Sequence, residues 1–251
     1  MTRHAIVTGG SRGIGFAIAQ RLLQDGMRVS IVGRDRDALE RAAAMLGSGV
    51  CHETADVTDY AAVSGAFNSL AQRQGGLAVL VNNAGAAESA PFDRTDENLW
   101  QRMIDVNLTS TYHCLRAATP MLLMTPDARV VNVASTAGQT GYPYVAAYCA
   151  AKHGVIGLTR ALAREWAGKS ITVNAVCPGF TDTDLVRESV ERIRRSTGRS
   201  AEQALASLTS SNPQRRLIDP AEVANAVSWL CDWRSGGITG QSISVSGGEV
   251  L

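Results

Sequence analysis

Tyr148 and Lys152 are the two residues of this sequence whose types and spacing are best suited to proton transfer. They stand four residues apart in a stretch of helical spacing, so both side chains emerge on one face of the helix. A tyrosine phenol has a reference pKa of about 10, and a neighbouring ammonium group stabilises the phenolate and lowers that pKa. The pair therefore predicts a proton donor, although the same spacing is common on helices that have no catalytic role.

A glycine-rich turn follows the first predicted strand and opens the first predicted helix. Glycines permit a tight bend and a close approach of the backbone to a pyrophosphate, and a helix N-terminus offers free amides and the positive end of its dipole. The turn therefore predicts a dinucleotide site, although glycines also end strands for structural reasons. The site residues expected here are Gly9, Ser11, Arg12, Gly13, Ile14 and Gly15.

The end of the second predicted strand indicates which dinucleotide is preferred. An NAD site carries an acidic residue about 20 residues after the glycines, whereas this chain has Gly33 and Arg34 there. Gly33 brings no carboxylate, and the guanidinium groups of Arg34 and Arg12 can hold a 2′-phosphate. We therefore expect NADP(H) to be preferred, with NAD(H) possible. The alternative is that both arginines are merely solvated, and the neighbouring Asp35 weakens the expectation.

Short apolar runs alternate with stretches of helical spacing along the whole chain. Strands are predicted at 4–8, 28–32, 77–82, 129–134, 172–176 and 242–245, with a weaker one at 50–55. Helices are predicted at 14–24, 38–46, 61–72, 99–118, 148–166 and 221–231. This alternation favours the α/β class, with a Rossmann-type doubly wound parallel sheet flanked by helices on both faces.

Length and composition narrow the possible partners. The 251 residues are 45% hydrophobic and no linker divides them, so we expect a single domain over 1–251. A formal net charge of +1 gives no broad electrostatic reason to bind nucleic acid or a membrane. The absence of a long apolar run or signal-peptide pattern favours the cytoplasm. The five cysteines form no CxxC pair, so we expect no metal site and no disulfide framework.

The motifs resemble, in order and spacing, those of the classical short-chain dehydrogenase/reductases, and the resemblance covers essentially the whole chain. It implies that Asp56 and Val57 contact the adenine, and that Asn82, Asn83, Ala84 and Gly85 form the segment that steadies the sheet beside the cofactor. It places Asn107, Ser135, Tyr148 and Lys152 on the catalytic tetrad. It places Pro178, Gly179, Thr181 and Thr183 on the segment that holds the nicotinamide carboxamide.

The resemblance implies reduction of a ketone to a secondary alcohol, or the reverse. In it, Ser135 polarises the carbonyl oxygen, Tyr148 donates the proton and NADPH delivers the hydride. Lys152 lowers the pKa of Tyr148, and the two residues together hold the nicotinamide ribose. Asn107 positions a water beside Lys152. A broken tetrad would instead indicate a catalytically silent nucleotide-sensing protein. The family commonly forms homotetramers through the helices expected at 99–118 and 148–166 and the C-terminal strand and tail to Leu251, although their apolar positions could be satisfied within a monomer.

The segment 184–212 stands where this family carries its variable substrate lid. Its arginines suit a small-molecule substrate bound to coenzyme A or acyl carrier protein, but Glu188 precedes Arg192 by four residues and Glu191 likewise precedes Arg195, as on ordinary exposed helices. That pairing would leave Arg187, Arg194 and Arg199 unpaired.

The residues that make up the motifs are most similar to those of 3-oxoacyl-thioester reductases and polyketide ketoreductases. This favours a 3-oxoacyl thioester substrate. Ala137 and Val145 stand where related 3-hydroxybutyrate dehydrogenases place polar residues, which disfavours a small free keto acid. Gln139, Tyr142 and Tyr144 line the same stretch and could border the substrate, including a cyclic or aromatic ketone, or merely pack against the lid.

Overall fold

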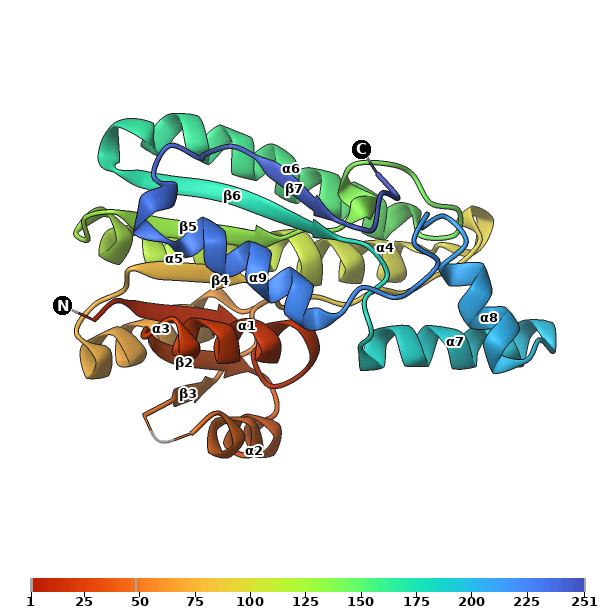
Figure 1. The fold of residues 1–251 in the computed structure, drawn as a ribbon, viewed down its shortest axis with the longest axis horizontal. Coiled ribbons are helices and arrows are strands. Elements are labelled where there is room, and N and C mark those ends of the chain that lie inside the picture. Colours follow the sequence, from red (N-terminus) through yellow and green to blue (C-terminus); the bar gives the residue numbers. More distant parts are fainter. Residues whose placement is uncertain (1, 48, 251) are drawn as a thin grey trace.

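A parallel sheet forms the centre of the molecule in the computed structural model, which describes residues 2–47 and 49–250 (Figure 1). Within those residues the sheet has seven strands in the order β3-β2-β1-β4-β5-β6-β7. The strands are β1 (His4–Thr8), β2 (Arg28–Gly33), β3 (Cys51–Thr54), β4 (Val79–Asn82), β5 (Ala128–Val133), β6 (Ile171–Pro178) and β7 (Ser242–Val245). This topology confirms the predicted fold class, and the weak run at 50–55 is a strand at the edge of the sheet.

Helices cover both faces of the sheet. Strands β1, β4, β5 and β6 are therefore buried along their whole length. One apolar layer joins the sheet to α1, α2 and α9, and a second joins it to α3, α5 and α6 (Figure 1). The helices are α1 (Gly13–Gln24), α2 (Arg36–Leu46), α3 (Tyr60–Gln74), α4 (Glu97–Ile104), α5 (Ser110–Leu123), α6 (Ala146–Trp166), α7 (Asp184–Thr197), α8 (Ala201–Leu208) and α9 (Pro220–Cys231). Among the described residues, no helix combines the length and apolar character that crossing a bilayer requires.

The single helix expected at 99–118 is wrong, because the chain there is divided into α4 and α5 by a π-helical turn, Asp105–Thr109. The side chain of Asn107 explains the break. Its Nδ2 donates to the carbonyl oxygen of Met103, one turn back, at 3.0 Å and to that of Ala86 at 2.9 Å. Since a side chain competes there for a backbone acceptor, the helical ladder widens locally.

The polar chain of Asn82, Asn132 and Thr159 crosses the interior between β4, β5 and α6. Asn82 Nδ2 donates to Asn132 Oδ1, and Asn132 Nδ2 donates to Thr159 Oγ1, each at 2.9 Å. All three side chains are buried, so these bonds satisfy donors that water cannot reach. The segment that begins at Asn82 therefore ties the two central strands to the helix that carries Tyr148.

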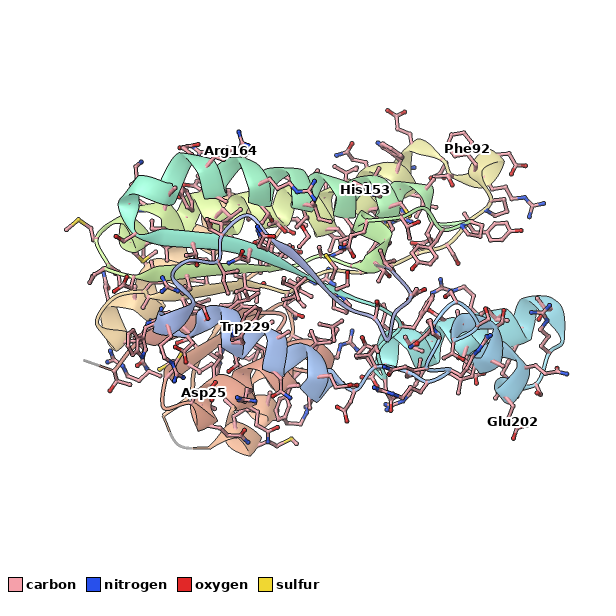
Figure 2. The ribbon with its side chains drawn as sticks, turned by 45° about the horizontal axis from the view of Figure 1, so that its top comes forward. Asp25, Phe92, His153, Arg164, Glu202 and Trp229 are labelled. Atoms are coloured by element: carbon pink, nitrogen blue, oxygen red, sulfur yellow. The ribbon has the colours of Figure 1, made fainter. Side chains whose placement is uncertain are left out.

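Helices α7 and α8 project beyond the carboxyl end of the sheet instead of covering one of its faces (Figure 1). Figure 2 shows Glu202 of α8 at this end of the molecule, with Phe92, from the segment after β4, at the same end. Both helices are amphipathic in sequence, yet α7 is largely exposed. The carboxyl end of the sheet thus lies between two projecting segments.

Candidate active site

Ser135 and Tyr148 meet at the carboxyl end of β5. Ser135 begins the short 3-10 turn Thr136–Gly138, where its Oγ accepts from the backbone N–H of Ala137 at 3.1 Å. Tyr148 lies in the first turn of α6, half-buried, and its interaction with the Ser135 side chain lowers the pKa of the phenol against the larger, opposite effect of burial. The two hydroxyl groups can therefore share one carbonyl oxygen, Ser135 as a hydrogen-bond donor and Tyr148 as a proton donor.

Lys152 follows Tyr148 by one helical turn and is 5% exposed. Its Nζ donates to the carbonyl oxygen of Val133 at 3.0 Å and lies 5.7 Å from the centroid of the Tyr148 ring. Burial lowers the pKa of Lys152 to about 8 and raises the pKa of Tyr148 to about 12. The expectation that the lysine lowers the tyrosine pKa is not met, because burial has the largest effect on the phenol and the ammonium donates to Val133. At neutral pH the phenol therefore keeps its proton.

Asn107 and Lys152 approach the same backbone position, Gly85. A Cβ on Gly85 would lie 2.7 Å from Asn107 Oδ1 and 3.7 Å from Lys152 Nζ. The Oδ1 atom also accepts from the backbone N–H of Ala86 at 3.2 Å. The structure therefore brings Asn107 Oδ1 and Lys152 Nζ to the same backbone position, and the absence of a side chain at Gly85 leaves room for Asn107.

Gly138 is a site residue that the sequence reasoning missed. A Cβ there would lie 2.6 Å from the carbonyl oxygen of Lys152, which is far inside normal contact. Because that backbone carries the lysine, a glycine at 138 sets how closely the Ser135 turn can pack on α6. A single glycine in a loop carries no sequence signal that would reveal this contact.

The glycine turn is built as the sequence predicts. Helix α1 begins at Gly13, and the side chain of its N-cap residue, Arg12, makes no capping bond, which leaves the first amides available to an anion. Gly9 has a φ of +65°, and a Cβ on Gly15 would lie 2.2 Å from the Gly9 carbonyl oxygen. Ser11 and Ile14 lie in the same turn, so these residues fit a bound pyrophosphate.

The segment after β4 holds this turn in place. Asn83 Nδ2 donates to the carbonyl oxygens of Thr8 and Gly9 at 3.0 and 3.2 Å. The backbone N–H groups of Asn83 and Ala84 both donate to Thr8 Oγ1, at 3.0 and 3.1 Å. The side chain of Asn83 thus braces the turn, which is consistent with the role that the resemblance implied for this segment.

Arg34 and Asp56 lie together at the other end of the nucleotide region. Arg34 Nη1 is 3.9 Å from Asp56 Oδ2, and both side chains are largely exposed. Two hydrogen bonds from Thr58 and the charge of Arg34 hold the pKa of Asp56 below its usual value, against the opposing effect of burial. Val57 is buried next to Asp56. A cation and an apolar residue therefore stand where the resemblance implied the adenine.

The segment after β6 connects the catalytic end with the glycine turn. Pro178 ends β6, and Thr181 Oγ1 donates to the carbonyl oxygen of Gly179 at 2.9 Å. Thr183 is the N-cap residue of α7, and a Cβ on Gly13 would lie 3.3 Å from its methyl carbon. The chain from Pro178 to Thr183 therefore runs from the sheet to the glycine turn, where a nicotinamide carboxamide could be bound.

The arginines of α7 are paired differently from the sequence expectation. Arg187 and Arg194, expected to be unpaired, form ion pairs: Arg187 with Asp182 and Asp184, and Arg194 with Glu191 at 2.6 Å. Glu191 takes the arginine three residues on, because that donor lies within reach on the helix face. An open groove of about 840 Å³ lies between this helix and the glycine turn, lined by Arg12, Asp184, Arg187, Glu188, Glu191, Arg192 and Arg195.

The three residues suggested for the substrate lie in different surroundings. Gln139 Oε1 accepts from Ser244 Oγ of β7 at 2.9 Å, so its amide faces the last strand. Tyr144 is 65% exposed. The Tyr142 hydroxyl donates to Glu249 Oε1 at 2.8 Å, a partner that the sequence did not indicate because it lies 107 residues away.

Known proteins share this architecture and these motifs. Residues 9–249 match a family described as enoyl-(acyl carrier protein) reductase. The D-beta-hydroxybutyrate dehydrogenase of Rhizobium meliloti (strain 1021) is 34% identical, covering 99% of this chain and 98% of its own. The 3-oxoacyl-(acyl-carrier-protein) reductase MabA of Mycobacterium tuberculosis (strain ATCC 25618 / H37Rv) is 37% identical, covering 99% of this chain and 93% of its own. A crystal structure of an actinorhodin polyketide ketoreductase variant with NADPH superimposes with a TM-score of 0.95, at 34% identity, over 99% of this chain and 97% of its own.

The sheet order and these similarities define an NAD(P)-dependent oxidoreductase that acts on ketones or alcohols. More narrowly, the chain belongs to the classical short-chain dehydrogenase/reductase family.

Proposed function

We propose that this protein reduces the ketone of a 3-oxoacyl thioester to the 3-hydroxyacyl thioester, with NADPH as the reductant. Ser135 holds the carbonyl oxygen, and Tyr148, protonated at neutral pH, donates its proton to that oxygen. Lys152 binds the nicotinamide ribose, and Asn107 holds the water from which a proton returns through Lys152 to the phenol. A bound nicotinamide cofactor supplies the hydride.

The cofactor would be held by the residues that already form a cradle. The turn from Gly9 to Gly15 takes the pyrophosphate, Asp56 and Val57 take the adenine, and Pro178 to Thr183 take the carboxamide. Preference for NADP(H) rests on Arg34, which is 71% exposed and therefore available to a 2′-phosphate, with Arg12 as a second cation. Arg34 lies 3.9 Å from Asp56 and Arg12 lies 4.0 Å from Asp184, measured between nitrogen and carboxylate oxygen. These ion pairs are long and exposed, so a phosphate can replace the carboxylates.

The observation that carries the thioester is the loop between Ser135 and Tyr148, which contains no basic residue. A free keto acid therefore has no cation in that loop for its carboxylate, whereas a thioester needs none. Two relatives of this chain are named 3-oxoacyl-(acyl-carrier-protein) reductases, and reduction of a 3-oxoacyl thioester is the activity proposed here. Residues 184–212 would act as the substrate lid, and Arg192 and Arg195, which take part in none of the ion pairs of the described residues, could bind carrier phosphates in the groove.

A second candidate substrate is a cyclic or aromatic ketone. The superposition on a polyketide ketoreductase at a TM-score of 0.95 favours it, as does the exposed ring of Tyr144 in the loop between Ser135 and Tyr148. The chain would act as a homotetramer, because Trp100 of α4 and Tyr112 of α5 are 39% and 46% exposed on the helices expected at the interface. Leu251, part of the expected interface, lies outside the described residues.

Nicotinamide absorbance tests the proposal directly. Purified protein is assayed with NADPH and NADH, each against acetoacetyl-CoA and a panel of cyclic and aryl ketones. Thioester turnover at least about tenfold higher with NADPH, a difference of about 1.4 kcal/mol, supports the proposal. Turnover of carrier-free ketones alone would favour the second candidate, and a preference for NADH would contradict the assignment of Arg34.

A further inference from the structure

Glu249 brings a carboxylate to the catalytic end of the molecule from the segment after β7. Its Oε1 accepts from Tyr142 Oη at 2.8 Å and from Ser211 Oγ at 2.6 Å. The same Tyr142 hydroxyl lies 2.9 Å from Thr136 Oγ1. Two hydrogen bonds therefore link Glu249 to the residue that follows Ser135.

The carboxylate also touches the segment after β6. A Cβ on Gly179 would lie 2.8 Å from Glu249 Oε2, so the missing side chain makes room for the carboxylate. The ring of Tyr142 meets the ring of Phe180 edge-on, with centroids 6.3 Å apart. Glu249 thus stands between the loop that follows Ser135 and the segment proposed to hold the nicotinamide.

The negative charge of Glu249 is uncompensated in the part of the chain that the structure describes, since none of the ion pairs there includes it. Its two partners on Oε1 are neutral hydroxyl groups. Burial raises the pKa of Tyr142, and the hydrogen bond to Glu249 and its charge add to this effect against the opposing hydrogen bond with Thr136, so the hydroxyl keeps the proton that it donates to the carboxylate. A half-buried charge acts on a nearby anion through a lower effective dielectric than water, so its repulsion is stronger there.

We propose that Glu249 is a specificity-determining residue that favours ketones with no charge close to the carbonyl and rejects free keto acids. The inference deepens the proposed function and rests on it in taking Ser135 as the residue that holds the carbonyl. In a 3-oxoacyl thioester the phosphates of the carrier lie far from the ketone. In free acetoacetate a single methylene group separates the carboxylate from the ketone. The substrate carboxylate and the Glu249 carboxylate therefore come close together.

Two substrates that differ only in charge test this inference. The ratio of kcat/KM for acetoacetate to that for methyl acetoacetate is measured in the wild-type protein and in Glu249→Gln, which keeps an acceptor oxygen but removes the charge. We expect the ratio to rise about tenfold in this variant. Glu249→Asp is the matched control, because it shortens the side chain and leaves the charge, and its ratio should stay within about twofold of the wild type.

A binding measurement accompanies the kinetics and requires no turnover. The Kd for 3-hydroxybutyrate and the Kd for its methyl ester are measured on the protein with NADP⁺ bound. In Glu249→Gln the ratio of the first Kd to the second should fall about tenfold relative to the wild type. If Glu249→Gln melts well below the wild type, Glu249→Leu, also uncharged, replaces it. An unchanged ratio in the neutral variant overturns the inference, and so does an equal shift in Glu249→Asp, since the effect would then come from the shape of the side chain and not from its charge.

Failure of this inference and failure of the proposed function give different results. The acid and ester pair uses no carrier, so a shifted ratio in a protein that does not reduce acetoacetyl-CoA would refute the thioester substrate alone. Thioester turnover with an unchanged ratio would refute the role of Glu249 alone.

Discussion

Gly138 provides a sharp test of how the site depends on one backbone contact. A Cβ there would lie 2.6 Å from the carbonyl oxygen of Lys152 and 2.9 Å from its carbonyl carbon. To bring the first distance to an ordinary 3.4 Å, the turn after Ser135 and the first turns of α6 must separate by about 0.8 Å. The substitution Gly138→Ala therefore acts on the position of the catalytic helix itself.

The expected cost follows from this separation. Overpacking of a buried contact costs about 1 to 3 kcal/mol, and a chain of this size loses roughly 2 to 4 °C in melting temperature per kcal/mol. Tyr148 and Lys152 lie in the part of α6 that must move, and a displacement near 1 Å costs about a hundredfold in rate. We therefore expect Gly138→Ala to lower kcat about a hundredfold and the melting temperature by about 2 to 12 °C.

Gly141→Ala is the matched control for this prediction. It lies in the same loop, three residues on, and a Cβ there meets no atom within 4 Å. Its stability should change by less than about 0.5 kcal/mol. The assay is ketone reduction followed at the nicotinamide absorbance, with thermal unfolding and an NADPH titration on each variant. Equal kcat values and melting temperatures in the two variants would refute the argument.

Four further predictions test other parts of the site and the assembly. Tyr148→Phe should abolish turnover while NADPH still binds, as measured by nicotinamide fluorescence, and retained turnover would remove Tyr148 from its role. Because burial lowers the pKa of Lys152 to about 8, its ammonium loses a proton as the pH rises through that value, so kcat/KM for reduction should fall above it; a profile that stays flat to about pH 10 would contradict this. Arg34→Leu should raise KM for NADPH about tenfold and leave KM for NADH nearly unchanged, whereas an equal effect on both would show that the arginine is only solvated. Light scattering at micromolar concentration should give the mass of four chains, because Trp100 and Tyr112 are exposed, and a monomer mass would defeat the tetramer.

The central sheet could be predicted from the sequence because its strands are short runs of buried apolar residues that alternate with helices. The predicted strands at 4–8 and 242–245 match β1 and β7 residue for residue, and the others differ by a few residues at their ends. The glycine turn could be predicted for a related reason, since its chemistry depends on residues that are neighbours in the chain. Local patterns are thus sufficient where the interactions themselves are local.

Contacts between distant segments could not be predicted. The π-helical turn at Asn107 depends on a hydrogen bond to Ala86, 21 residues away. Glu249 meets Tyr142 across 107 residues, and no motif marks either partner. One local feature was also missed: the ion pairs of Arg187 and Arg194 join residues three apart, but several acidic side chains lie within reach of each arginine, so the sequence does not say which one pairs. The shape and charge of the substrate end are therefore properties of the folded chain.

The buried polar chain from Asn82 through Asn132 to Thr159 also selects one alignment of the strands during folding. Asn82 stands opposite Asn132 where β4 pairs with β5. The valines around them would tolerate several alignments, but a shift of β5 by one residue would turn Asn132 to the opposite face of the sheet. Asn82 Nδ2 would then be buried without this acceptor, at about 1 to 3 kcal/mol, whereas the Thr159 hydroxyl keeps its bond to the carbonyl oxygen of Val155. An apolar replacement of all three residues would remove this penalty, and with it a safeguard against misaligned strands beneath the catalytic helix.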